Sequence, residues 1–207
     1  VEMDDLTIAA IASRETYLTT FDWSDADVAL TDILWKGVIS PIMFQTSGFY
    51  GTLDSAIMQP TSMMYAARPF AYWRGRIRIR LEIVCSKFHR GKLLFKFEPN
   101  VAMNALISSN TTKLNQQNTC ILDIQDAQDI AFEFDWAQTR NFCRVSDTPW
   151  RTVSLVESPV DIELAASNYD RMEYNASNGF FDVRVLNELV QPSQTAPVVV
   201  NVYVSCA

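Results

Sequence analysis

The chain has 207 residues, of which 48% are hydrophobic, and its 12 Phe, 7 Tyr and 5 Trp can fill a sizeable core. The formal net charge is −7 and no basic run marks either end, which argues against an arm that condenses nucleic acid. No apolar run approaches the ~20 residues that span a bilayer, and no signal-peptide pattern opens the sequence. Only 20% of the residues are charged, which indicates that other subunits cover part of the surface.

We expect a single domain over residues 1–207, because no repeat and no low-complexity linker divides the chain. The first residue is Val1 rather than Met, which fits cleavage from a polyprotein and fits trimming equally well. The four cysteines are widely spaced and form no CxxC motif, which predicts free, mostly buried thiols in a reducing compartment. They are Cys85, Cys120, Cys143 and Cys206.

The N-terminal part opens with an acidic and then apolar segment, 1–14, which we expect to form an arm on a neighbour or on the sheet. Residues 16–23 alternate and are rich in aromatic and β-branched side chains, which predicts the first strand. An N-cap signal at Ser24 predicts a short helix through Ala29. A second strand is expected at about residues 33–40.

The next segment has two parts. Residues 42–60 contain scattered Gly, Ser and aromatic residues and are expected to form an ordered connection. Residues 61–67 favour helix, and this helix should end before Pro69, because proline disfavours the helical conformation in the residue that precedes it.

The most regular pattern predicts a long hairpin over residues 70–99. Between residues 76 and 84 every second residue is apolar, which indicates a half-buried strand because successive side chains leave opposite faces. Its apolar face carries Ile77, Ile79, Leu81 and Ile83. Its opposite face carries Arg76, Arg78, Arg80 and Glu82.

Residues 89–91 are expected to form the turn of this hairpin. A second alternating strand follows as far as Pro99, which cannot donate to a strand ladder. One face of this strand carries Leu93, Phe95 and Phe97, and the other carries Leu94, Lys96 and Glu98. The hairpin should therefore have one apolar face and one charged face.

Residues 100–118 are polar and are expected to form an exposed loop. Strands are expected at 119–125 and at 129–136, the second with its apolar side chains inward. These side chains are Ile130, Phe132, Phe134 and Trp136.

Residues 137–178 form a long connection, and a connection of this length inside a compact domain is usually functional. Within it, 153–156 and 161–164 are candidates for short strands. The last two alternating runs, 180–189 and 198–205, predict two further strands.

Two segments of the hairpin resemble a known family. The first is Arg68-Pro69-Phe70-Ala71-Tyr72-Trp73-Arg74-Gly75, and the second is Phe88-His89-Arg90-Gly91-Lys92-Leu93 with the Glu98-Pro99 that follows. Both are similar to the coat proteins of picorna-like viruses, above all to dicistrovirus-like and marnavirus-like members. In that family the Trp-Arg-Gly segment opens the fourth strand and the Phe-His-Arg-Gly turn leads into the fifth.

Alternating strands with turn signals favour a sandwich or barrel and leave a jelly roll and an immunoglobulin-like arrangement open. The resemblance implies the jelly roll: an all-β, eight-stranded antiparallel sandwich with one or two short helices. One sheet is then expected to hold the strands at 16–23, 76–86, 130–136 and 198–205. The other is expected to hold those at 33–40, 92–98, 119–125 and 180–189.

The expected core consists of the inward positions of these strands, and a slip of one residue in register would turn each of them outward. It contains Ile77, Ile79, Leu81, Ile83, Phe95, Phe97, Phe132, Phe134, Val183, Val185, Val200 and Val202.

Catalytic motifs are scarce. The single histidine, His89, is the one candidate for a His-based triad or metal site, and Cys85 lies four residues before it. We expect a structural hydrogen bond at a turn histidine rather than a catalytic Cys–His pair. No GxSxG, P-loop, HExxH or GxGxxG motif occurs. We therefore expect no catalytic, cofactor-binding or metal-ligating residues and no cofactor.

Asp22, Asp25 and Asp27 place three carboxylates within six residues, a density that can hold Ca²⁺. The EF-hand pattern, with its glycine and distal glutamate, is not met. We therefore favour capping and solvation as the roles of these side chains.

The clearest charge pattern is a row of arginines at alternate positions, here called the arginine row. It consists of Arg74, Arg76, Arg78 and Arg80. Guanidinium groups bind phosphate bidentately, so one interpretation is contact with packaged RNA. The other is pairing across strands with Glu133 and Asp135, which the family's sheet order would place beside the row. We favour pairing, because the net charge is acidic, and expect carboxylate partners for at least two of the last three arginines.

The resemblance implies a structural protein and no enzyme. The expected function is that of a capsid subunit of a small non-enveloped positive-strand RNA virus, released from a polyprotein and assembled in the host cytoplasm. Its expected partners are paralogous capsid proteins and copies of itself in an icosahedral virion, genomic RNA through weak, non-specific contact at most, and a host receptor. The alternative is a non-viral jelly-roll module that binds carbohydrate as lectins do. A cupin-like enzyme is nearly excluded, because it typically needs several histidine ligands.

Overall fold

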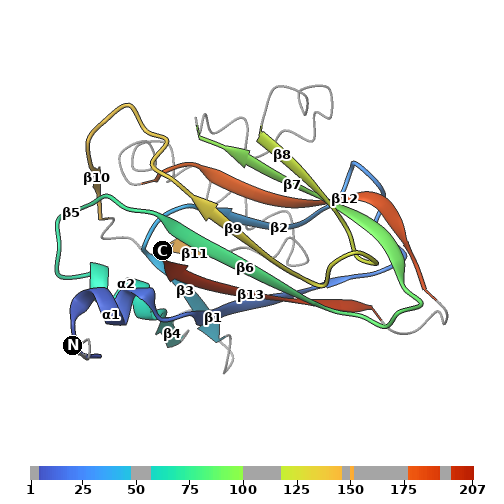
Figure 1. Ribbon diagram of the computed structural model, residues 1–207, viewed down its shortest axis with the longest axis horizontal. Helices are drawn as coiled ribbons and strands as arrows, with labels where there is room; N and C mark the ends of the chain where they lie inside the picture. Colours follow the sequence, from blue (N-terminus) through green and yellow to red (C-terminus); the bar gives the residue numbers. More distant parts are fainter. Residues whose placement is uncertain (1–4, 48–56, 100–117, 146–149, 152–176, 192–196) are drawn as a thin grey trace.

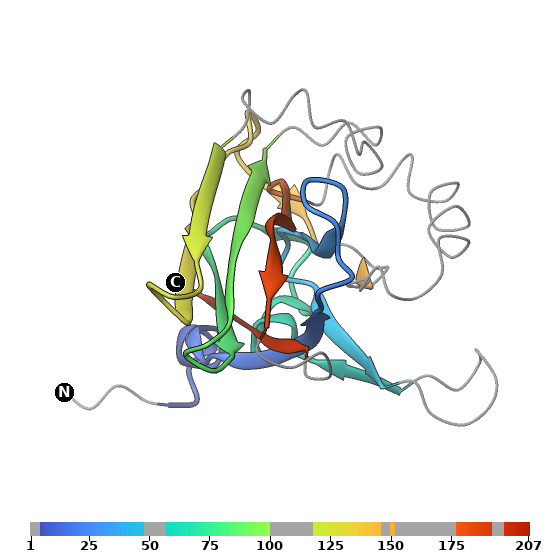
Figure 2. The ribbon, with the colours of Figure 1, turned by 90° about the vertical axis from the view of Figure 1, so that its right-hand side faces the viewer.

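The computed structural model describes residues 5–47, 57–99, 118–145, 150–151, 177–191 and 197–207. These residues form two four-stranded antiparallel sheets that face each other (Figure 1, Figure 2). The first sheet has the order β1 (Thr16–Trp23), β13 (Val198–Cys206), β6 (Ile77–Val84) and β9 (Asp129–Phe134). The second has the order β2 (Ile33–Val38), β12 (Phe180–Val190), β7 (Arg90–Glu98) and β8 (Asn118–Asp123).

The chain crosses repeatedly from one sheet to the other, and this connectivity defines a jelly roll. The central strand pairs join residues far apart in sequence, as Val200 of β13 opposite Ile83 of β6 illustrates. Each sheet contains the four strands that were expected to share it, so the predicted fold class and sheet composition are confirmed.

Smaller elements lie around the sandwich. The three-stranded sheet has the order β11 (Trp150–Arg151), β3 (Met43–Ser47) and β4 (Ile57–Pro60), and a two-stranded sheet pairs β5 (Tyr72–Trp73) with β10 (Cys143–Arg144). Two short helices are α1 (Ile8–Ser13) and α2 (Ser62–Ala67). Neither described helix has the length and apolarity that a membrane crossing requires.

The core lies between the two sheets, where the predicted register is confirmed. Ten of the twelve expected core residues are buried, and the other two, Phe97 and Phe132, are half-buried and pack against the same cluster. Phe95 and Phe181 stack in parallel at 6.1 Å, and Trp35 meets Phe181 edge-on at 6.0 Å. Each such aliphatic or aromatic side chain contributes ~1.5–3 kcal/mol of hydrophobic stabilisation when fully buried, so the alternating strands hold the sheets together.

The N-terminal arm expected over residues 1–14 is replaced, in its described part, by α1. The Thr7 hydroxyl caps this helix by accepting from the Ala10 amide at 3.2 Å. Its Ile- and Ala-rich sequence packs against α2, and alanine favours helix strongly. Contact with α2 therefore favours a helix at residues 8–13, where the sequence pattern predicted only an arm.

The helix predicted from Ser24 through Ala29 is wrong, and this segment forms turns. The Asp27 carboxylate accepts hydrogen bonds from the Ser24 amide at 2.6 Å and from its hydroxyl at 3.0 Å. Leu30 has φ of 62° and donates its amide to Val185 O at 2.7 Å. The side-chain hydrogen bonds and this left-handed residue favour a turn over a continuing helix.

Three other expectations change. The connection at 42–60 contains β3 and β4, which are too short to show an alternating pattern. The hairpin predicted over residues 70–99 is wrong, because β6 and β7 lie in different sheets and pair with other strands. The chain turns between them at Lys87–Phe88, earlier than the predicted turn at 89–91, and Arg90 already belongs to β7. The candidate strands at 153–156 and 161–164, and residues 100–117 of the predicted polar loop, lie outside the described residues. The helix predicted before Pro69 is confirmed as α2.

Candidate interaction surface

The outer face of the first sheet carries the arginine row, because the alternation of β6 directs Ile77, Ile79, Leu81 and Ile83 into the core. Arg78 lies opposite Glu133 of β9, and Arg80 lies opposite Tyr203 of β13. The row therefore runs along the centre of the sheet, with acidic residues on the edge strand β9 beside it.

Arg76 and Arg80 are paired with carboxylates. Arg76 donates from Nε to Asp135 at 2.6 Å and from Nη1 to Glu133 at 3.2 Å. Arg80 contacts Glu15 and Asp129, each at 2.7 Å. Two of the three arginines thus have carboxylate partners, as expected. Arg76 uses the predicted residues, whereas the partners of Arg80 were not foreseen.

These contacts shift the ionisation of the groups involved. The hydrogen bond from Arg80 lowers the pKa of Asp129, and the same contact, followed by that with Glu15, raises the pKa of Arg80. The hydrogen bond with Asp135 raises the pKa of Arg76. These shifts favour the charged forms of Asp129, Arg76 and Arg80 and therefore the ion pairs that they make.

A tyrosine extends the network across β13. The Tyr203 hydroxyl donates to Glu82 at 3.0 Å, which raises the pKa of Tyr203, and its ring lies 5.2 Å beneath the Arg80 guanidinium. Tyr17 of β1 meets the Tyr203 ring edge-on at 5.8 Å. This face is a connected polar surface rather than a row of free cations.

The other two arginines behave differently. Arg78 is half-buried and makes no ion pair within the described part of the chain, and its Nε is buried without a hydrogen-bond partner there. Arg74 lies before β6 with its guanidinium 5.9 Å from the Trp136 ring. Trp136, expected to point inward from the strand, lies beyond the end of β9 and packs edge-on against Trp73 at 5.3 Å.

The outer face of the second sheet contains a cluster of buried charges. Asp182 of β12 lies opposite both Lys36 of β2 and Lys96 of β7. Its carboxylate contacts Arg184 Nε at 3.1 Å and Lys96 Nζ at 3.7 Å. Asp182 and Arg184 are each 1% exposed and Lys96 is 7% exposed.

This cluster lies on the face of β7 that was predicted to be charged and that carries Leu94, Lys96 and Glu98. Leu94 and Lys96 are buried, so both faces of β7 are covered at this point. Burial lowers the pKa of Lys36 from 10.5 to about 8, and attraction to Asp182 opposes that shift. Sequence alternation predicted the direction of these side chains but could not show that the outer face is covered.

Of the three aspartates considered for Ca²⁺, Asp27 closes its own turn on Ser24, and Asp22 and Asp25 are exposed. Among the residues that the structure describes, no group of three His, Cys, Asp or Glu side chains is placed to hold a metal ion. Turn capping is therefore the role that the geometry gives to Asp27.

His89 makes the predicted structural hydrogen bond, because its Nδ1 accepts from the Ser86 amide at 3.0 Å in the turn between β6 and β7. Cys85 instead accepts from Gln128 Nε2 at 3.3 Å. Burial raises the pKa of the Cys85 thiol, which disfavours the thiolate that a nucleophile needs. The four cysteines are free thiols, as predicted, although Cys143 alone is fully buried and Cys120 is exposed.

The described residues thus form a jelly roll whose first sheet presents a polar outer face of paired charges. Comparison with known proteins shows where this fold and sequence recur. No family model matches the chain. Its sequence is 28% identical over 189 residues to the structural polyprotein of Cricket paralysis virus, covering 91% of the chain and 19% of that polyprotein.

It is also 31% identical over 150 residues to the genome polyprotein of human hepatitis A virus genotype IIIA, covering 70% of the chain and 16% of that polyprotein. The chain thus spans less than a fifth of the length of these curated relatives. Among solved structures, a marine algae virus of the order Picornavirales has a TM-score of 0.74 at 27% identity, over 99% of this chain and 73% of that one.

A Triatoma virus empty capsid has a TM-score of 0.75 at 17% identity, over 99% of this chain and 73% of that one, and shows the same fold. The resemblance to the capsid proteins of picorna-like viruses, predicted from the hairpin, is confirmed by these matches. They lend no support to the lectin alternative.

Proposed function

We propose that the chain is a structural capsid subunit of a small non-enveloped positive-strand RNA virus. The observation that carries this proposal is the agreement in fold and sequence with the marine algae virus chain over 99% of the present chain. Similarity to a polyprotein whose name describes it as structural supports the same role and release from a larger precursor. No enzymatic activity is expected of such a subunit.

The subunit assembles with sister capsid proteins and with copies of itself into an icosahedral virion. The relatives in which this fold occurs are described as virions and capsids, which supports this assembly and a virion location. Residues 1–207 act as one jelly-roll domain in the shell. Assembly takes place in the host cytoplasm, where four unpaired cysteines remain reduced.

Contact with genomic RNA is weak and non-specific. Two arginines of the row are neutralised by carboxylates, and the net charge of the chain is −7, so little cationic surface remains for phosphate. A host receptor is a further partner proposed for the assembled particle.

Co-expression of this chain with its sister capsid proteins tests the proposal. Sedimentation and electron microscopy should show closed particles that contain the chain. If the chain instead stays a small soluble species under these conditions and binds immobilised glycans, the capsid assignment is overturned and the lectin-like alternative is favoured.

A further inference from the structure

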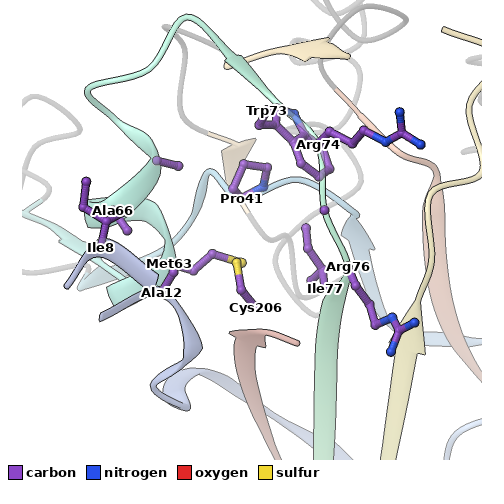
Figure 3. A pocket seen from close by; sticks show the side chains of 12 residues that line it. Ile8, Ala12, Pro41, Met63, Ala66, Trp73, Arg74, Arg76, Ile77 and Cys206 are labelled. Atoms are coloured by element: carbon purple, nitrogen blue, oxygen red, sulfur yellow. The ribbon is translucent and has the colours of Figure 1, made fainter. Parts of the chain in front are cut away.

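A small apolar pocket lies outside the sandwich, between α1, α2, the segment that joins β5 to β6, and the end of β13 (Figure 3). Its volume is about 150 Å³. Its apolar walls are Ile8, Ala12, Met63, Ala66, Ile77 and Cys206. An apolar cavity of ~150 Å³ accommodates a benzene-sized group, so this pocket has room for one apolar side chain.

The charged residues that line the pocket are both cationic. They are Arg74 and Arg76, and Figure 3 shows both guanidinium groups extending to the same side of the pocket. Arg76 is held by Asp135 and Glu133, whereas Arg74 makes no ion pair within the described residues. A chain of net charge −7 therefore presents an apolar pocket beside a cation that no carboxylate of the described residues contacts.

Gly75 forms part of the pocket wall, and packing within the chain does not explain it. A Cβ built on Gly37 or Gly91 would lie within 2.7 Å of the ring of Trp35 or Trp23, and Gly179 has φ of +136°. A Cβ on Gly75 would meet nothing within 4 Å. Glycine often marks a site where another backbone approaches closely, and the open space at Gly75 would allow such an approach.

Three exposed aromatic residues lie on the segments that border the pocket. Tyr65 on α2, Phe70 after it and Tyr72 on β5 are 68%, 48% and 61% exposed. Tyr and Arg are enriched in contacts between proteins. These segments therefore offer side chains that suit a polypeptide partner.

We propose that this pocket receives one apolar side chain from an extended segment of another capsid subunit, with an acidic residue beside that anchor contacting Arg74. Charge complementarity and the open space over Gly75 specify the chemistry of the partner: an apolar anchor, a neighbouring carboxylate and a closely approaching backbone. This inference rests on the proposed function, because it assigns the partner to the same shell.

Two substitutions test the inference in co-expressed capsid proteins. Gly75→Leu adds an apolar side chain to the pocket wall at a position where a Cβ meets nothing within 4 Å, and Arg74→Glu reverses the charge beside it. Matched controls are Ala26→Leu, at an exposed turn, and Arg90→Glu, at the start of β7. Both test variants should lower the particle yield by about tenfold or more, as for loss of a central contact, whereas the controls should not.

Thermal melting of each free chain reports folding separately, and the two test variants should melt as the unsubstituted chain does. Unchanged particle yields for Gly75→Leu and Arg74→Glu would overturn the inference, and so would equal losses in the controls. If the unsubstituted chain forms no particles at all, it is the proposed function that fails. The two failures are therefore distinguishable.

Cys206 provides a second measurement that needs no substitution, because its partly exposed thiol lines the pocket. Its alkylation by iodoacetamide should be slower by about tenfold or more in intact particles than in the free chain. The reason is that an apolar side chain inserted in the pocket excludes solvent, and the reagent with it, from the thiol. Dissociation of the particles should restore the rate. Equal rates in particles and in the free chain would show an empty pocket and contradict the inference.

Discussion

Asp182 and Arg184 lie two residues apart on β12 and form a two-point ion pair, with Nε at 3.1 Å and Nη2 at 3.2 Å from the carboxylate oxygens. Both residues are 1% exposed, on the sheet face that points away from the core. Lys96 reaches the same carboxylate at 3.7 Å. Within the described residues, Asp182 thus contacts two buried cations, and its removal takes this partner from both.

Asp182→Asn should therefore destabilise the fold strongly. Breaking a buried pair from one side costs about 3–5 kcal/mol, because an uncompensated charge stays out of water. Urea unfolding of the purified chain measures the effect. Glu133→Gln, which removes an exposed partner of Arg76, is the matched control and should shift the midpoint far less. Equal shifts for the two variants would contradict the assignment of a buried, structurally coupled pair.

The contribution of Lys36 to the stability of the chain should increase as the pH rises. Its pKa is lowered to about 8 in the folded chain from an ordinary 10.5, so between these values the unfolded chain binds more protons at this residue. Stability from this group therefore increases as pH rises through that window. Burial raises the pKa of Cys85, Cys143 and Cys206, and these thiols act in the opposite sense near the same pH.

The Lys36→Met variant isolates the lysine from the thiols, since both proteins contain the same cysteines. We expect the variant to be more stable near pH 7 and its advantage to shrink between pH 8 and 10.5. Urea unfolding at a series of pH values gives this difference. A difference that does not vary with pH would show that Lys36 is not desolvated in the folded chain.

Arg78→Gln should leave the RNA content of purified particles unchanged. Arg76 and Arg80 are bound by carboxylates, and one half-buried guanidinium adds little to the attraction of a phosphate backbone. The ratio of absorbance at 260 and 280 nm (a standard measure of nucleic acid in particles) reports the outcome. Particles that lose much of their RNA while the empty shells still form would instead support the RNA-contact interpretation of the row.

His89→Ala should affect stability and nothing catalytic. The variant loses the acceptor for the Ser86 amide in the turn between β6 and β7, an effect of ~0.5–1.5 kcal/mol for a typical hydrogen bond. His89→Asn keeps a side-chain acceptor at this position and should recover part of the loss in thermal melting. A hydrolytic activity of the purified chain that disappeared with His89→Ala would contradict the structural role.

The strands and their faces follow from local sequence. In β6 the alternation of Ile77, Ile79 and Leu81 with arginines decides which side chains enter the core, because the pleat directs neighbours to opposite sides. The contact of Arg76 with Glu133 could be predicted once the order of strands was known. That order came from the resemblance of the hairpin to a known family, since periodicity alone left the topology open.

The tertiary structure decided which of these faces are covered. Alternation places Lys96, Asp182 and Arg184 on an outer face, but only the packing of the chain shows that this face is buried. In the same way, Arg80 pairs with Glu15 because β1 and β6 lie on either side of β13. The helix α1 forms part of a pocket because α2 lies against it. Local sequence fixes the direction of a side chain through backbone geometry, whereas its surroundings depend on segments distant along the chain.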